Sequence, residues 1–229
     1  MYYPFFDPTM ILLIPALLLS FWAQMRVKST FDRFSRVRPR GGVTGAQVAR
    51  MLLDRFGLSS VPVNRVPGNL TDHYDPRDRT LSLSDSVYSS SSIAAVGVAA
   101  HEVGHAIQHS EGYAPLMFRN RMAPAVGLVS NMAIPLFFLG FLMRGQFLMN
   151  LGIVLFLGAI VFHLVTLPVE YNASSRAIAI LNGTGALAPD ELNGAKRVLD
   201  AAAWTYVAAA LMALLQLVRL LVLRGSRER

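Results

Sequence analysis

The chain has 229 residues, of which 53% are hydrophobic and only 15% are charged. A soluble domain carries about 25% charged residues, and a disordered chain combines high charge with low hydrophobicity, so this composition excludes both classes. The net charge is +7, but no dense Lys/Arg tract with interleaved aromatic residues accompanies it, so we expect no nucleic-acid partner.

Charge-free windows long enough to cross a bilayer occur four times. They cover residues 8–25, 122–143, 145–169 and 201–218. The first is not a cleaved signal peptide, because Asp7 stands where such a peptide has basic residues. We therefore predict a mainly α-helical integral membrane protein with about four transmembrane helices. Its predicted parts are an N-terminal anchor (1–25), a soluble portion (26–121), a transmembrane hairpin (122–169), a helix and connector (170–200) and a C-terminal transmembrane helix with a basic tail (201–229).

Basic residues directly after the first span predict the orientation. They are Arg26, Lys28, Arg33, Arg36, Arg38 and Arg40. Since Lys and Arg collect on the cytoplasmic side, we expect the N-terminus outside and this segment in the cytoplasm. The hairpin then returns the chain to the cytoplasm near Glu170, and the tail lies outside. That tail, residues 224–229, is itself basic and conflicts with the same rule, so we expect the early basic flank to dominate.

The soluble portion has the pattern of a small α+β unit. Helical spacing of apolar residues predicts a helix over 44–56, capped by Thr44. Alternation predicts strands over 61–66 and 80–84, the second as a short edge strand, with a turn over 69–76 between them. Small residues predict a further helix over 92–109.

That last helix contains His101-Glu102-Val103-Gly104-His105, an H-E-x-x-H motif. Residues i and i+4 lie one turn apart on nearly the same face of a helix, so both imidazoles can bind one metal ion, with Glu102 beside them as a base. The chain has no cysteine, which excludes a cysteine zinc site, a thiol nucleophile and a disulfide scaffold. His109 is an unsuitable third ligand, because on a continuing helix it lies roughly 12 Å beyond His101.

Glu170 is the better candidate for the third ligand. It is an acid at the inner end of the third span, where an unpaired charge is costly and a metal ion would compensate it. The intervening hairpin crosses the bilayer twice, so Glu170 and His105 lie on the same side. The alternative is an acid that pairs with Arg176.

The segment from Glu170 to Ser174 resembles the second motif of gluzincin peptidases, in which an Asp four residues after the ligand Glu holds a ligand imidazole. HtpX-type membrane proteases show a similar Glu-Tyr-x-Ala-Asp pattern, but here a serine stands at the fourth position. The chain more closely resembles the YugP-type family of membrane zinc metallopeptidases. This resemblance rests on residues 70–76, 99–109, 111–115, 170–177 and 195–202.

The resemblance implies a zincin-like catalytic portion with one catalytic Zn²⁺, in a neutral metallopeptidase of the bacterial cytoplasmic membrane. The metal would be held by His101, His105 and Glu170. Around these ligands we expect Ser174, Asn172 and Arg176, with the serine hydroxyl accepting an imidazole N–H.

The predicted reaction is hydrolysis of peptide bonds in membrane or membrane-proximal proteins, on the cytoplasmic side. Glu102 would take a proton from the attacking water and deliver it to the leaving amine. His73 or Tyr74 is a candidate donor to the developing oxyanion. The strand residues expected to pair with an extended substrate are Leu81, Ser82 and Leu83.

Other readings of the sequence remain open. The principal alternative is a catalytically weak or inactive zinc-binding scaffold or regulator on the same fold, although the intact Glu102 favours the enzyme. A site-2-type intramembrane protease would take an Asp ligand from an Asp-Gly motif, and the chain has no such pair. Expected partners are a protein or peptide substrate and the lipid bilayer, with a membrane regulator or a second copy as further candidates.

Overall fold

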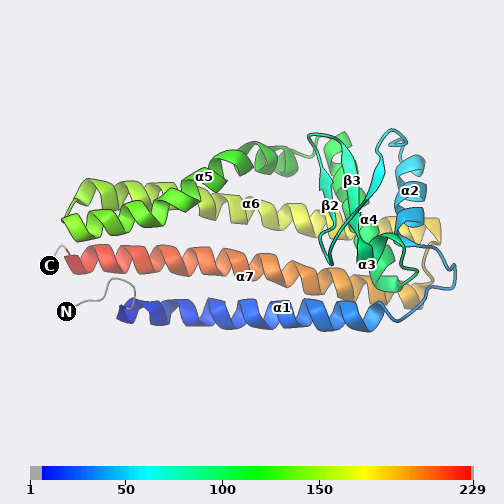
Figure 1. Ribbon diagram of the computed structural model, residues 1–229, viewed down its shortest axis with the longest axis horizontal. Helices are drawn as coiled ribbons and strands as arrows, with labels where there is room; N and C mark the ends of the chain where they lie inside the picture. Colours follow the sequence, from blue (N-terminus) through cyan, green and yellow to red (C-terminus); the bar gives the residue numbers. More distant parts are fainter. Residues whose placement is uncertain (1–6, 228–229) are drawn as a thin grey trace. The chain divides into compact units, whose positions relative to one another are not determined.

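The computed structural model describes residues 7–227, and four long helices dominate it. They are α1 (Ile14–Phe34), which follows the short 3-10 helix η1 (Pro8–Leu13), α5 (Ala114–Met143), α6 (Gln146–Thr184) and α7 (Pro189–Arg227). All four are long and apolar enough to cross a membrane (Figure 1). Large apolar side chains on them stay exposed, as expected for surfaces that face lipid; Phe147 is 75% exposed. The prediction of a mainly helical membrane protein is confirmed, and the four helices are candidates for the four predicted spans.

The described chain divides into two compact units, and each long helix contributes residues to both. One unit holds Gln24–Leu116 and Pro168–Trp204. The other holds the rest of the described chain, which is the part up to Ala23, Met117–Leu167 and the part from Thr205 onward.

The first of these units contains a small α+β arrangement. Its further elements are α2 (Gly45–Arg55), β1 (Val63–Val66), β2 (His73–Asp75), β3 (Thr80–Ser84), α3 (Asp85–Tyr88) and α4 (Ile93–Ser110). Helix α2 begins with a capping box, in which Thr44 and Gln47 satisfy each other's backbone N–H groups. Fully buried apolar side chains of α2, β3 and α4 form one core, among them Leu52, Leu81 and Val96. The predicted helices and the strand over 80–84 are therefore present.

The sheet corrects two expectations. Its strand order is β1-β3-β2, with β1 parallel and β2 antiparallel to β3. Residues 73–75, expected within a turn, form a strand because His73 and Tyr74 pair with Ser82 and Leu81. Strand β3 is therefore central rather than an edge strand.

The prediction that β3 pairs with an extended substrate is wrong for the same reason. Both of its edges carry partner strands, β1 along Leu81–Ser84 and β2 along Thr80–Ser82. The side chains of Leu81, Ser82 and Leu83 are also buried. These residues belong to the core.

Helices α4 and α6 approach each other closely at Gly104. A Cβ added to this glycine would lie 2.7 Å from the backbone oxygen of Ala173. Real Cβ atoms do not occur so close to an oxygen, so only glycine allows this approach. Helix α6 runs unbroken from Gln146 to Thr184, and Glu170 therefore lies inside a long helix rather than at the start of a separate one.

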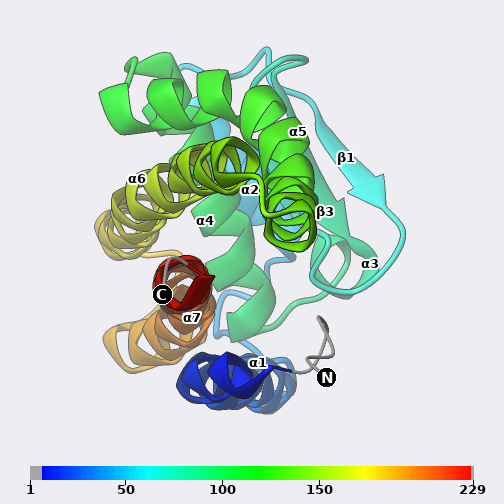
Figure 2. The ribbon, with the colours of Figure 1, turned by 90° about the vertical axis from the view of Figure 1, so that its left-hand side faces the viewer.

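The other unit contains the hairpin of α5 and α6 and a buried ion pair. A Cβ on Gly152 of α6 would lie 2.7 Å from the backbone oxygen of Ala133 of α5, so these helices also pack in close contact. Helices α1 and α7 run side by side in both ribbon views (Figures 1 and 2). The Arg219 Nη2 of α7 donates to Asp7 Oδ2 over 2.6 Å, and both side chains are 7% exposed.

Substitution of Gly104 by alanine tests the close approach. Overpacking of this kind costs about 1–3 kcal/mol, which lowers the unfolding temperature of a chain this size by several degrees. Thermal unfolding of the full chain in detergent, followed by circular dichroism, measures the shift. Gly183→Ala is the matched control, because nothing lies within 4 Å of a Cβ there and alanine favours the helix. Equal unfolding temperatures for the two variants would contradict the role of Gly104.

Candidate metal centre

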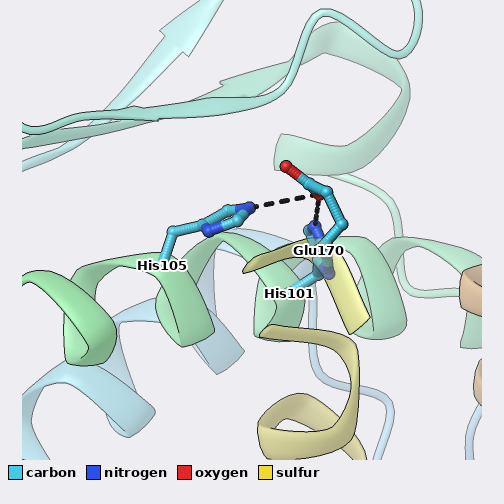
Figure 3. Close-up of side chains that lie close together, drawn as sticks. All are labelled: His101, His105 and Glu170. Atoms are coloured by element: carbon cyan, nitrogen blue, oxygen red, sulfur yellow. Dashed lines mark hydrogen bonds and ion pairs between the residues drawn. The ribbon is translucent and has the colours of Figure 1, made fainter. Parts of the chain in front are cut away.

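Two helices bring together the imidazoles of His101 and His105 and the carboxylate of Glu170 (Figure 3). The histidines lie one turn apart on α4, with ring centres 4.7 Å apart. Glu170 reaches them from α6; its Oε2 lies 3.2 Å from Nε2 of His101 and 3.5 Å from Nε2 of His105. One candidate ligand atom from each residue falls within a group no more than 4.8 Å across.

The amide of Gln108 determines how His105 presents its lone pair. The Gln108 Nε2 donates to the backbone oxygen of Val169 and to Oδ1 of Asn172, both at 2.9 Å. Its Oε1 is therefore the atom 3.0 Å from His105 Nδ1, and it can only accept. Nδ1 of His105 therefore carries a hydrogen, and the neutral tautomer consistent with this contact has its lone pair on Nε2, on the side of Glu170.

The polar contacts continue from Gln108 along α6 to the surface. Asn172 Oδ1 also accepts a hydrogen bond of 2.8 Å from Arg176 Nε, and the Nη1 of this arginine lies 2.7 Å from Oε2 of Glu111. Arg176 is thus engaged by Asn172 and Glu111 rather than by Glu170, which was the alternative for this acid. The arginine stands two side chains away from the imidazole and supports the amides that orient it.

His101 has a partner of its own on α6. The Ser174 Oγ lies 3.1 Å from Nδ1 of His101, on the ring atom opposite the one near Glu170. The Ser174 hydroxyl thus lies where it can accept an N–H from the imidazole of His101. Both imidazoles are therefore held through Nδ1 by neutral side chains, and both direct Nε2 to the same carboxylate.

The donor set fits a zinc ion. Two imidazole nitrogens and one carboxylate form one of the ligand sets of catalytic zinc sites, and each imidazole has a partner for its other nitrogen, as metal-binding histidines usually do. With Nδ1 of His105 protonated, Nε2 and the Glu170 carboxylate are two acceptors facing each other. In this tautomer a metal ion between the two atoms would bind to both of them. The side chains of His105 and Glu170 are 9% and 5% exposed.

Glu102 follows His101 on α4 and is buried. Burial raises the pKa of its carboxyl to about 7; the charge of His101 opposes this shift, while Glu170 and Asp72 add to it. A carboxyl with a pKa near neutrality is suited to accept a proton and to return it.

The two candidate oxyanion donors differ in their surroundings. The His73 Nδ1 donates to the backbone oxygen of Thr71 over 2.9 Å, so Nε2 donates only when the ring is an imidazolium. Tyr74 points to α4, where its hydroxyl lies 2.9 Å from Nδ1 of His109. Burial raises the pKa of Tyr74 and lowers that of His109, so the phenol donates to a neutral imidazole. His109 lies on the unbroken helix α4, outside the cluster of candidate ligands.

Gln108 is the site residue that sequence reasoning missed. It is fully buried, although it is a long polar side chain on a helix rich in small apolar residues. Its position three residues after His105 places it on the same face of the helix. A polar residue at that spacing from a candidate ligand was the available signal.

Comparisons with known proteins agree with this chemistry. Residues 9–225 match the family described as "Putative neutral zinc metallopeptidase". The chain is 51% identical over 220 residues to "Putative membrane protease YugP" of Bacillus subtilis (strain 168), with 95% of this chain and 97% of that protein covered. No solved structure matches the chain.

Gln108→Leu tests the orientation of His105. Leucine removes the acceptor for the Nδ1 hydrogen, and loss of such a partner typically weakens metal affinity 10–100-fold. Competition for zinc between the purified chain and a chelator of known affinity measures the loss. His109→Gln is the control, because this neighbouring side chain turns to Tyr74 and should leave zinc affinity unchanged. The same affinity in both variants would argue against a role for Gln108.

Proposed function

Since the chain belongs to the "Putative neutral zinc metallopeptidase" family, we propose that it is a membrane-embedded zinc endopeptidase that hydrolyses peptide bonds with Glu102 as the proton carrier. The observation that carries the proposal is the convergence of His101, His105 and Glu170 within 4.8 Å. It is supported by the buried carboxyl of Glu102 beside these residues.

In this proposal His101, His105 and Glu170 hold the zinc ion. When bound, zinc acts as a Lewis acid that polarises the scissile carbonyl and lets water ionise near neutral pH. Ser174 and Gln108 keep the imidazole rings in position. Glu102 accepts the proton of the attacking water and delivers it to the nitrogen of the leaving amine.

In this proposal the substrate backbone lies along β2 rather than along β3, where the sequence had predicted it. Strand β2 is the last strand in the sheet order, so its outer edge is not paired with another strand of the described chain. An extended peptide can add to such an edge through backbone hydrogen bonds. Strand β2 also packs against α4, the helix that carries Glu102, since the Tyr74 hydroxyl lies 2.9 Å from Nδ1 of His109. His73 as an imidazolium is the remaining candidate for oxyanion stabilisation.

We further propose a multi-pass orientation in the bacterial cytoplasmic membrane, with the site on the cytoplasmic side. The basic residues 26–40 support it, since they follow the first span directly. The basic tail, residues 224–229, is the conflicting signal, and we propose that the larger basic cluster after the first span dominates it. Protein segments near the cytoplasmic membrane surface are the substrates that such a site would reach.

Glu102→Gln tests the proposed reaction. The amide cannot carry the proton, so hydrolysis should fall about 10²–10⁴-fold or more while bound zinc is retained. Cleavage of an unfolded, fluorescently labelled protein by the detergent-purified chain measures activity, and metal analysis measures zinc.

Asp54→Asn is the matched control for this experiment, because it removes a carboxylate from the exposed face of α2. Asp54→Asn should cleave the substrate as the wild type does, and chelation of zinc should stop cleavage by either protein. Activity retained by Glu102→Gln would overturn the mechanism. Zinc without cleavage in the wild-type chain would favour the scaffold instead.

The absence of cysteine makes the orientation directly measurable. We expect Arg144→Cys and Ser226→Cys to react with a membrane-impermeant maleimide on intact spheroplasts. Val37→Cys should react only after permeabilisation, because it lies among the basic residues after the first span. The cysteine-free chain is the background control. Labelling of Val37→Cys from outside would reverse the proposed topology.

A further inference from the structure

A cavity of about 460 Å³ lies between α1 and α7, away from the candidate metal ligands. Its lining residues are Arg26, Ser29, Thr30, Arg33 and Phe34 of α1 and Arg197 of α7. All belong to the compact unit that contains Gln24–Leu116 and Pro168–Trp204. The lining combines three guanidinium groups with two hydroxyl groups and contains no acid.

Helix geometry explains why these side chains meet. Arg26, Thr30 and Arg33 are spaced by four and three residues, so they share one face of α1. Helix α7 is fixed against this face because a Cβ on Gly194 would lie 2.8 Å from Cε1 of Phe34. Arg197 follows Gly194 by three residues, and it therefore lies on the side of α7 that meets α1.

The lining of the cavity carries positive charge from both helices. Within residues 7–227, neither Arg33 nor Arg197 forms an ion pair with an acid. The nearby Asp200 is engaged by Lys196 over 2.6 Å. Guanidinium groups gathered in this way repel one another, and an anion between them is stabilised. Arginine forks match the oxygen geometry of a phosphate group.

The position of the cavity along α1 indicates which kind of phosphate-bearing molecule can reach it. Exposed apolar side chains precede the arginines directly; Leu18, Phe21 and Met25 are 64%, 63% and 49% exposed. The step from Met25 to Arg26 is thus the end of the apolar stretch. Arg26 and Arg33 are separated by roughly 10 Å of helix rise, and the polar headgroup layer is about 5–8 Å thick on each side of a bilayer. A cavity that begins at this point lies at headgroup level.

We propose that this cavity is a phosphate-binding site that takes the headgroup phosphate of an anionic phospholipid. The guanidinium groups of Arg33 and Arg197 hold the phosphate oxygens from two helices. The bound lipid joins α1 to α7 at the membrane surface. This site is independent of the metal centre and of peptide hydrolysis.

Lipid retention by the full chain tests the site. The detergent-purified protein is titrated with dioleoyl phosphatidylglycerol, with dioleoyl phosphatidylcholine and with inorganic phosphate, and native mass spectrometry counts the bound molecules. We expect the wild type to bind one phosphatidylglycerol at least tenfold more tightly than phosphatidylcholine. Arg33→Gln with Arg197→Gln should lose that preference by about tenfold or more, since each basic residue near a lipid surface contributes to it.

Arg36→Gln with Arg38→Gln is the matched control, because these arginines are exposed like Arg33 and Arg197 but do not line the cavity, so the same charge is removed elsewhere. Arg33→Lys with Arg197→Lys keeps the charge and serves as the test if the glutamine variant does not fold. Its affinity for phosphatidylglycerol should lie between those of the wild type and the glutamine variant. Another outcome is that inorganic phosphate binds to the wild type and not to the cavity variants. That result would support the phosphate site, with a soluble phosphate as its ligand instead of a lipid. Equal losses in the control and cavity variants, or no preference over phosphatidylcholine with no phosphate binding, would overturn the proposal.

Discussion

The contact between α4 and α6 at Gly104 determines where the third candidate ligand can lie. Two histidines on one helix define only one side of a metal site, and the other side must come from a second helix at backbone contact. Ala173, whose oxygen faces Gly104, stands three residues after Glu170, about one turn away. Hydrogen bonds flank this contact, from Gln108 to Val169 on one side and between Ser174 and His101 on the other. The glycine and these bonds together fix the helices in the register that the ligands need.

The partners of the imidazoles are neutral, and this has a chemical consequence. A carboxylate behind a metal-binding histidine raises the basicity of the ring, whereas an amide or a hydroxyl orients the ring with little change in basicity. The charged groups at the end of these contacts lie farther from the imidazoles, where Arg176 pairs with the half-exposed Glu111. The buried acids close to the imidazoles are thus Glu102 and Glu170, one suited to carry a proton and one to bind a cation.

The sequence predicted those features that depend on composition or on helical period. The four candidate spans, the helix from Gly45 and the helix with the two histidines follow from charge-free windows, a threonine cap and helical spacing. The strand at His73 was not predicted, because its own residues are polar and its pairing with β3 is a contact between separate chain segments. The central place of β3 depends on the same pairing. The role of Gln108 was not predicted because it depends on Val169 and Asn172, which come 61 and 64 residues later in the chain and become neighbours only in the fold.

The ion pair between Asp7 and Arg219 constrains how this protein is made. The two residues are separated by 212 positions, yet their side chains meet in a buried place. Translation proceeds from the N-terminus, so Asp7 leaves the ribosome long before Arg219 has been added. Until then its carboxylate must remain hydrated or protonated, because a buried charge without a partner is unfavourable. The start of the first long helix therefore acquires this partner only after the last long helix has been synthesised, and this contact is completed at the end of synthesis.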